Sequence, residues 1–271
     1  MRIGIIGFGT IGKFVFEHVQ KNNVPGGTIA VILVRTIKEE VAQAAKEANA
    51  LLTTNWEDLL HNDVDVVVET ASHEALEAVG LPVLRSGIDL ITLSIGALVD
   101  TTLLKNLQQA AKEGNSLFQV PSGGIGGLDA LQTALIAGVE KVTMTTRKAP
   151  IAWTEIPYVQ KLGVDLENMS EKTVLYEGPA AECVKEFPKN INIAAALSLA
   201  GIGFEKTIIR IIADPEVEFN THEIACEGAA GKFTMVLENV PVPENPRTTY
   251  MACLSAVAAL NRIHTHYRVG T

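Results

Sequence analysis

The first twelve residues, MRIGIIGFGTIG, constrain the fold of this chain more than any other stretch. Residues 3–6 form a short apolar run of strand-favouring residues, and Gly7, Gly9 and Gly12 follow in the spacing G-x-G-x-x-G. The first glycine permits a sharp turn, the second leaves no Cβ between the backbone and a pyrophosphate, and the third lets a following helix pack closely on the strand. A glycine-rich turn of purely structural origin matches the same spacing. Because an amphipathic segment follows at 13–20, we favour a dinucleotide site, with contacts predicted at Gly7, Gly9, Thr10, Ile11 and Gly12.

The first half of the chain alternates between apolar runs and helical patterns. The predicted strands are 3–6, 28–34, 63–69, 90–94 and 116–120, and the predicted helices are 13–20, 41–51, 74–79 and 102–112. This alternation predicts an α/β fold with an N-terminal Rossmann-type, doubly wound parallel sheet. Ligands of such sheets lie beyond the carboxyl ends of the strands, so Ala71 and Ser72 are predicted cofactor contacts. His73 is either a candidate for catalysis or the start of the next helix.

Arg35 follows the second predicted strand, at the position that usually discriminates between the two nicotinamide dinucleotides. An acidic residue there binds the ribose 2′-hydroxyl of NAD, whereas an arginine accommodates the 2′-phosphate of NADP. No acid follows the strand until Glu39. The sequence therefore predicts NAD or NADP as cofactor, with NADP tolerated or preferred, and the alternative is a solvated arginine at a strand end.

A change of composition at Pro121 marks the expected domain boundary. The stretch PSGGIGG, residues 121–127, is either a second anion-binding turn, the hinge between domains, or both. We expect a dinucleotide-binding domain at 1–121 and an α+β substrate and oligomerisation domain at 122–245, with a closing helix at 246–263 that returns to the first domain. The elements predicted for the second domain are strands at 139–146, 173–176, 206–213, 217–226 and 232–238, and helices at 128–136 and 191–200.

Composition excludes several classes of function. The formal net charge is −9 and no long basic run occurs, which argues against nucleic acid or an anionic membrane as a partner. The first strand begins directly at Met1 and no apolar stretch is long enough to span a bilayer, so we expect a cytoplasmic protein. The three cysteines, Cys183, Cys226 and Cys253, are odd in number and far apart, which predicts buried thiols rather than a disulfide framework or a metal site.

Three polar positions in the second half are candidates for chemistry. His222 interrupts an otherwise apolar predicted strand, where a histidine is either a proton-transfer group or a satisfied structural residue. Lys148 is the last residue of the TRK motif, 146–148, at the end of the strand predicted at 139–146. Lys189 precedes the predicted helix, where it would either help hold a carboxylate or belong to an ordinary capped helix start.

Six motifs together resemble the L-aspartate dehydrogenase family. They are PSGGIGGLDAL (121–131), TRK (146–148), FPKNINIAAALSLAGIGF (187–204), ADP (213–215), FNTHEI (219–224) and ENVPVPENPRTTY (238–250). With the N-terminal glycine motif, the resemblance spans nearly the whole chain. Two departures occur: Gly124 stands where the family often carries alanine, and Ala149 replaces a frequent proline.

The resemblance implies a specific reaction. The family oxidises L-aspartate to iminosuccinate with NAD or NADP, and the imine hydrolyses to oxaloacetate and ammonia. His222 matches the family's active-site histidine, and Gly124 and Asn192 match its nicotinamide contacts. By position alone, Ser122, Lys148 and Lys189 are candidates to hold the two substrate carboxylates.

Two rival functions are compatible with the same sequence. One is an NAD(P)-dependent dehydrogenase or reductase of a different dicarboxylate or imine, because a fold does not determine its substrate. The other is a protein that senses NAD(P) without turnover. The presence of His222 argues against a sensor, because a sensor needs no proton-transfer group. A homodimer formed through the second domain is expected in either case.

Overall fold

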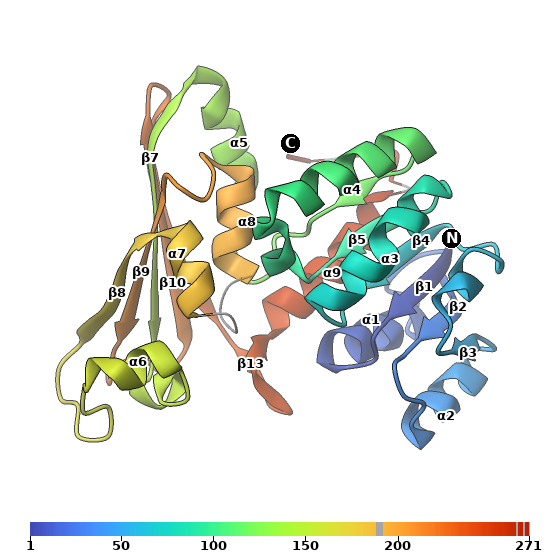
Figure 1. The fold of residues 1–271 in the computed structure, drawn as a ribbon, viewed down its shortest axis with the longest axis horizontal. Coiled ribbons are helices and arrows are strands. Elements are labelled where there is room, and N and C mark those ends of the chain that lie inside the picture. The colour runs from blue at the N-terminus through green and yellow to red at the C-terminus, as the bar shows by residue number, and fades with distance from the viewer. Residues whose placement is uncertain (188–191, 264, 268, 271) are drawn as a thin grey trace. The chain divides into compact units, whose positions relative to one another are not determined.

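The structure, a computed structural model, describes residues 1–187, 192–263, 265–267 and 269–270. The chain forms two compact units, which are described separately (Figure 1). Met1–Gly123 and Ala252–Arg268 make up the first, and Gly124–Met251 with Val269–Thr271 the second. The chain thus leaves the first unit after Gly123, whereas the sequence-based boundary lies after Pro121.

The first unit is built on a parallel sheet of six strands. They are β1 (Arg2–Ile6), β2 (Thr28–Leu33), β3 (Leu51–Thr53), β4 (Val66–Glu69), β5 (Asp89–Thr92) and β6 (Phe118–Gln119), in the order β3-β2-β1-β4-β5-β6. Strand β1 pairs with β2 on one side and with β4 on the other. The strand order reverses between β1 and β4, which is where doubly wound sheets bind their ligands. The predicted Rossmann-type sheet is confirmed.

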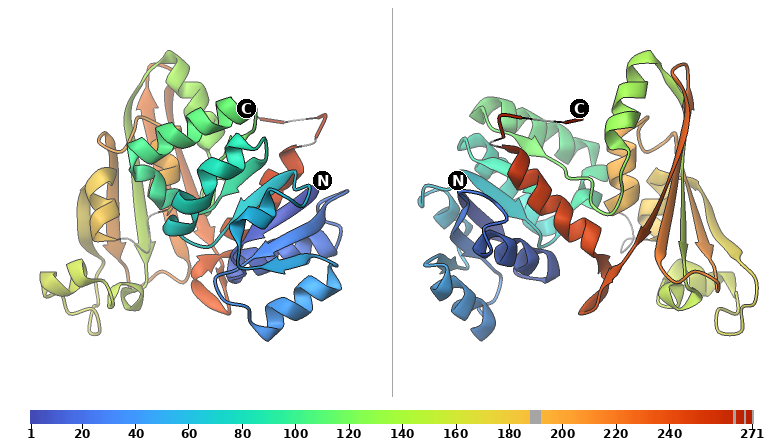
Figure 2. Two further views of the ribbon diagram at one scale, coloured as in Figure 1. Left: turned by 45° about the vertical axis from the view of Figure 1, so that its right-hand side comes forward. Right: turned by 180° about the vertical axis from the view of Figure 1, so that it is seen from behind.

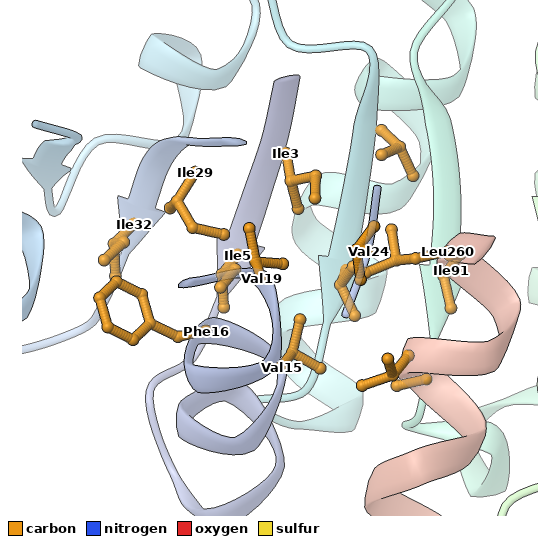
Figure 3. Packing of buried hydrophobic residues seen from close by; sticks show 14 of the residues in the cluster. Ile3, Ile5, Val15, Phe16, Val19, Val24, Ile29, Ile32, Ile91 and Leu260 are labelled. Carbon is orange, nitrogen blue, oxygen red and sulfur yellow. The ribbon is translucent and has the colours of Figure 1, made fainter. Parts of the chain in front are cut away.

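Helices cover both faces of this sheet (Figure 2). They are α1 (Thr10–Gln20), α2 (Glu39–Glu47), α3 (His73–Arg85), α4 (Thr101–Gly114) and α9 (Tyr250–Ile263). One core joins β1 and its neighbours to α1 and to the distant α9: Ile3 and Ile5 pack with Val15, Val19 and Leu260 (Figure 3). All five of these side chains are at most 4% exposed, so the last helix completes the hydrophobic core of the first unit.

In two places the structure has a strand where part of a helix was predicted. The helix expected at 41–51 ends at Glu47, and Leu51 begins the short strand β3 beside β2. The closing helix expected at 246–263 begins only at Tyr250. Residues 245–249 instead form β13 (Asn245–Thr249), which pairs with β12 (Pro241–Val242). The proline and β-branched residues of this stretch disfavour a helix interior, and a strand partner is available.

The second unit is built on a mixed sheet of five strands. They are β7 (Val139–Lys148), β8 (Thr173–Pro179), β9 (Thr207–Ala213), β10 (Asn220–Gly228) and β11 (Gly231–Asn239), in the order β11-β10-β7-β9-β8. The β7–β9 pair is parallel and the other pairs are antiparallel. This confirms the predicted α+β character of the second half.

Within this unit, helices lie against one face of the sheet (Figure 1). They are α5 (Leu128–Ala137), α7 (Ala180–Glu186) and α8 (Asn192–Ala200), and the short α6 (Pro157–Leu162) lies near one end of the strands. The covered face carries Met144, Ile209 and Ile224, all nearly inaccessible to solvent. The alternate residues point the other way, and Val236 on that side is 52% exposed.

The three cysteines are buried free thiols, as predicted. Across the described ranges, no helix combines the length and apolar character that a membrane span requires.

Candidate active site

The glycine turn joins β1 to α1 with the geometry that its sequence predicts. Gly7 adopts a φ of +85°, a left-handed conformation that favours glycine. Gly9 is exposed, and a Cβ placed on it would have no neighbour within 4 Å. Gly12 is buried, and a Cβ there would overlap the carbonyl oxygen of Gly7. The first and third glycines are therefore required by packing, whereas Gly9 leaves an open approach to the backbone.

The start of α1 is suited to an anion. In the described part of the chain, Gly9 at the helix N-cap supplies no side-chain hydrogen bond and the first turn contains no acidic residue. In contrast, the hydroxyl of Ser72 caps α3 and the carboxylate of Asp100 caps α4. Backbone N–H groups and the helix dipole at an uncapped N-terminus favour a phosphate. The turn thus fits the pyrophosphate of a dinucleotide.

The loop after β4 lies directly against this turn. The Thr70 hydroxyl is 3.1 Å from the carbonyl oxygens of both Ile6 and Gly7 and donates to them. A Cβ on Gly7 would lie 2.7 Å from the Cβ of Ala71. Ala71 and Ser72, predicted from their position after a strand, are thus in the same place as the predicted glycine contacts.

Arg35 follows β2 and is exposed. It lies close enough to Glu74, in the first turn of α3, to act on it electrostatically. The pKa of Glu74 is lowered chiefly by a hydrogen bond from the Ser72 side chain, and the charges of His73 and Arg35 act in the same direction. Arg35 therefore belongs to the neighbourhood of the Ser72 loop, and His73 is the first residue of α3.

In the second unit, His222 lies in the middle of the sheet beside Thr146. The two residues are register partners on the adjacent strands β10 and β7. The Nδ1 atom of His222 is 3.0 Å from the hydroxyl oxygen of Thr146, and the side chains are 2% and 6% exposed. The next inward residue of β10 is the apolar Ile224. A polar pair thus occupies an otherwise apolar face.

Lys148 lies two residues beyond Thr146, at the end of β7. Its ammonium nitrogen is 5.3 Å from the centroid of the Trp153 ring, a cation–π contact. Trp153, fully buried at the end of a 3-10 turn (Pro150–Trp153), donates from its indole nitrogen to the Lys148 carbonyl oxygen at 3.4 Å. The aromatic ring therefore supports both the backbone and the side chain of Lys148.

Burial changes the acidity of both His222 and Lys148. Burial lowers the pKa of Lys148 to about 8. Burial and, secondarily, the charge of Lys148 lower the pKa of His222 to about 3. Near neutral pH, His222 is thus a neutral imidazole and Lys148 is mostly a cation. A neutral base beside a cation is a suitable arrangement for an anionic substrate that must lose a proton.

Gly124 is held at the start of the second unit by Asn239, from the end of β11. The side-chain amide of Asn239 donates to the Gly124 carbonyl oxygen at 2.6 Å, and both residues are buried. A Cβ on Gly124 would lie 3.1 Å from Ile193 Cδ1, so α8 begins beside this loop. Asn192, the exposed first residue of α8, directly precedes Ile193, the residue that Gly124 approaches.

The remaining predicted substrate contacts are Ser122 and Lys189. Lys189 lies outside the described residues. Ser122 belongs to the loop that ends the first unit, whereas Lys148 belongs to the second. In the described ranges, no cluster of three or more His, Cys, Asp or Glu side chains is arranged to hold a metal ion.

Three polar residues that contact predicted site residues were not themselves predicted from the sequence. Glu69 ends the apolar strand β4, Thr146 contacts His222, and Asn239 holds Gly124. An acid at the end of a wholly apolar strand was a detectable signal for Glu69. Thr146 and Asn239 become conspicuous only through contacts between residues far apart in the sequence.

Two family models match this chain, and the gap between them lies near the boundary between the two units. Residues 7–121 match the family described as homoserine dehydrogenase, NAD binding domain, and residues 129–263 match the family described as aspartate dehydrogenase, C-terminal. An L-aspartate dehydrogenase of Methanosarcina acetivorans is 42% identical over 100% of both chains. One of Ralstonia pickettii is 38% identical over 97% of this chain and 98% of its own.

Solved structures agree with these relatives. The crystal structure of aspartate dehydrogenase from Thermotoga maritima superposes with a TM-score of 0.78 at 28% identity, covering 100% of this chain and 99% of the other. Together with the glycine turn and the buried histidine, these similarities define an NAD(P)-dependent oxidoreductase whose first unit is the NAD(P)-binding domain. More specifically, the chain belongs to the aspartate dehydrogenase family.

The different surroundings of Gly9 and Gly12 generate a prediction. In Gly9→Ala, the new methyl group meets no protein atom but occupies the approach of the pyrophosphate. We expect an unchanged melting temperature and a dissociation constant for NADH raised at least about tenfold, equivalent to about 1.4 kcal/mol. In the matched Gly12→Ala variant, overlap with the Gly7 carbonyl should lower the melting temperature as well. Thermal denaturation and NADH fluorescence titration measure both quantities, and normal NADH binding by Gly9→Ala would contradict the site.

Proposed function

We propose that the protein catalyses the reversible, NAD(P)-dependent oxidative deamination of L-aspartate to iminosuccinate, which hydrolyses to oxaloacetate and ammonia. The observation that carries this proposal is the buried, neutral His222 beside the cation Lys148, in a chain whose other unit is an NAD(P)-binding domain. The relatives named above, which the chain matches over their full length, support aspartate as the substrate.

The dinucleotide supplies the hydride acceptor for the reaction. The residues around the glycine turn fit it, because Gly9 leaves the backbone open and α1 begins without an acidic residue in its first turn. The positions proposed to bind the cofactor are Gly7, Gly9, Thr10, Ile11, Gly12, Arg35, Ala71, Ser72, Gly124 and Asn192. No metal takes part in the proposal.

His222 is the proposed acid–base group. If its Nδ1–H donates to the Thr146 hydroxyl, Nε2 keeps a lone pair that can accept a proton. As hydride leaves Cα, the substrate ammonium must lose one proton to give the protonated imine, and a water then adds to the imine carbon before ammonia leaves. His222 accepts the ammonium proton in the first step and releases it to solvent. In the second step it accepts a proton from the adding water and returns it to the amino group, which leaves as ammonia. Bound substrate carboxylates would raise the pKa of the imidazole from its low value toward the working range.

Lys148 is the proposed partner of one substrate carboxylate. It is mostly protonated below pH 8, and its half-buried position strengthens an ion pair relative to one in water. Ser122 and Lys189 remain weaker candidates for the second carboxylate, because position in the sequence is their sole support.

The test of this function compares wild type with His222→Ala. Reduced nicotinamide formed at saturating NAD and NADP would be followed with L-aspartate and, as competing substrates, L-glutamate and L-alanine. We expect turnover with aspartate alone, and a loss of about a hundredfold or more in His222→Ala, since a positioned acid or base contributes about that factor. The dissociation constant for NADH should barely change. Turnover of another amino acid in preference to aspartate would instead favour a different dehydrogenase.

Two control variants separate chemistry from stability. Ile224→Val shortens the next inward side chain of the same strand, so it should lower the melting temperature slightly and leave kcat unchanged. Thr146→Val keeps the shape of its side chain and removes the hydroxyl that orients His222, so it should lower kcat by an intermediate factor. A stably folded His222→Ala protein with normal turnover would eliminate the assignment, and absence of turnover in wild type would favour the sensing protein.

Arg35 is proposed to contact the 2′-phosphate of NADP, so that NADP binds at least as well as NAD. A charged hydrogen bond of this kind contributes about 1.5–3 kcal/mol. Arg35→Ala should therefore raise the KM for NADP about tenfold or more and leave the KM for NAD nearly unchanged. Lys112→Ala, which removes an exposed cation from α4 in the same unit, is the charge control. Equal changes for NAD and NADP in Arg35→Ala would show that the arginine does not distinguish them.

We also propose that the protein is a homodimer in which the uncovered face of the second sheet meets its counterpart. This face exposes Val174 and Val236, which are 44% and 52% exposed. Sedimentation equilibrium should give twice the chain mass of 29.0 kDa. Val236→Lys should shift the equilibrium toward monomer, because a cation would have to be desolvated at the contact. A wild-type monomer at micromolar concentration would refute the dimer.

A further inference from the structure

Glu69 is an acidic side chain with no role in the reaction described above, and it is fully buried in the first unit. It ends β4 and is the register partner of Thr92 on β5. A carboxylate removed from water loses a large hydration free energy, and hydrogen bonds to its oxygens are needed to compensate for this loss. Its surroundings therefore have to supply donors.

Four donors surround the carboxylate. Oε2 accepts from the Thr92 hydroxyl at 2.6 Å, and Oε1 accepts from the Ser94 hydroxyl at 3.0 Å. Oε1 also accepts from the backbone N–H groups of Ala71 at 2.7 Å and Ser72 at 3.1 Å. The two backbone bonds fix the loop that follows β4, and the two hydroxyl bonds fix the carboxylate to the adjacent strand.

The loop held in this way forms one wall of the glycine turn. Thr70 donates to the carbonyl oxygens of Ile6 and Gly7, and Ala71 lies so close to Gly7 that a Cβ there would clash. The contact between Ala71 and Gly7 prevents the loop from moving closer to the glycine turn. The hydrogen bonds from Ala71 and Ser72 to Glu69 hold the loop in this position. The distance between loop and turn thus depends on the carboxylate.

We propose that Glu69 is a positioning residue for the dinucleotide: it holds the Ala71–Ser72 backbone against the glycine turn and so sets the width of the cofactor site. Glu69 itself does not touch the cofactor. The inference rests on the dinucleotide binding included in the proposed function, and it adds a residue that acts through the loop.

The two oxygens of a carboxylate are needed for this role. The Thr92 hydroxyl already accepts a hydrogen bond from the Ser94 backbone N–H at 3.1 Å, and its own proton goes to Oε2. A glutamine in place of Glu69 has one acceptor oxygen, and its NH2 group would face a hydroxyl that needs an acceptor. Glu69→Gln therefore keeps the size of the side chain and loses part of the network.

The test measures NADH binding and steady-state kinetics on Glu69→Gln and Ser94→Ala. Glu69→Gln should raise the dissociation constant for NADH about tenfold, the effect of losing a charged hydrogen bond. The KM for aspartate and kcat at saturating cofactor should stay within about twofold, because the loop acts on cofactor binding. Ser94→Ala removes one donor to the carboxylate and should produce a smaller increase in the same dissociation constant.

Val66→Ala is the matched control for stability. Val66 is equally buried and begins β4, at the end of the strand opposite Glu69. It should lower the melting temperature and leave NADH affinity unchanged. An equal loss of NADH affinity in Val66→Ala, or normal affinity in Glu69→Gln, would overturn the inference.

Ser94→Ala keeps the test decisive if Glu69→Gln does not fold, because unchanged NADH affinity in that variant would also refute the role. Failure of the wild-type protein to bind any dinucleotide would instead contradict the proposed function.

Discussion

The close approach of the β1–α1 turn to the loop after β4 is the contact on which the first unit depends. A Cβ on Gly12 would overlap the Gly7 carbonyl oxygen, and a Cβ on Gly7 would overlap Ala71, so both positions require glycine. This packing brings α1 down onto the sheet and leaves the backbone at Gly9 open, at the reversal of strand order where we propose that the cofactor binds. The Glu69 carboxylate accepts hydrogen bonds from the Ala71 and Ser72 backbone N–H groups in the same loop. One local packing constraint therefore supports both the core and the proposed cofactor site.

The two units obtain their chemical properties in different ways. The glycine turn of the first unit offers mainly backbone groups to a phosphate, and any sequence with glycines at the right positions can provide these groups. This is consistent with the match of the first unit to a family described as homoserine dehydrogenase, NAD binding domain. The second offers particular side chains, His222, Thr146 and Lys148, on an apolar sheet face where burial lowers the pKa values of His222 and Lys148. The aspartate dehydrogenase family model matches residues 129–263, most of the second unit together with α9, and substrate chemistry depends on side chains rather than on the fold.

Much of the candidate site can be proposed from the sequence because its signals are local. The glycine spacing, Arg35 after a strand and a histidine within an apolar strand are each visible in fewer than about ten consecutive residues. Helix and strand limits were less accessible where pairing partners decide them. Leu51 follows an alanine-rich helical pattern but joins β2 as a strand, and residues 245–249 pair with 241–242 before α9 begins. At Leu51, pairing with β2 outweighs local helix propensity, whereas residues 245–249 disfavour a helix and pair with the strand just before them.

The sequence alone determined the alternation of most strands and helices, the spacing of the glycine turn and the family resemblance, because periodicity and glycine spacing reflect backbone geometry directly. The tertiary structure alone decided which polar groups meet. Thr146 lies 76 positions from His222 in the chain, and Asn239 lies 115 positions from Gly124. It also decided that α9 completes the core of the first unit and that Glu69 is surrounded by four donors. The long-range contacts among these arise from strand register and helix docking, which depend on the packing of the whole unit and cannot be recognised in a short stretch of sequence.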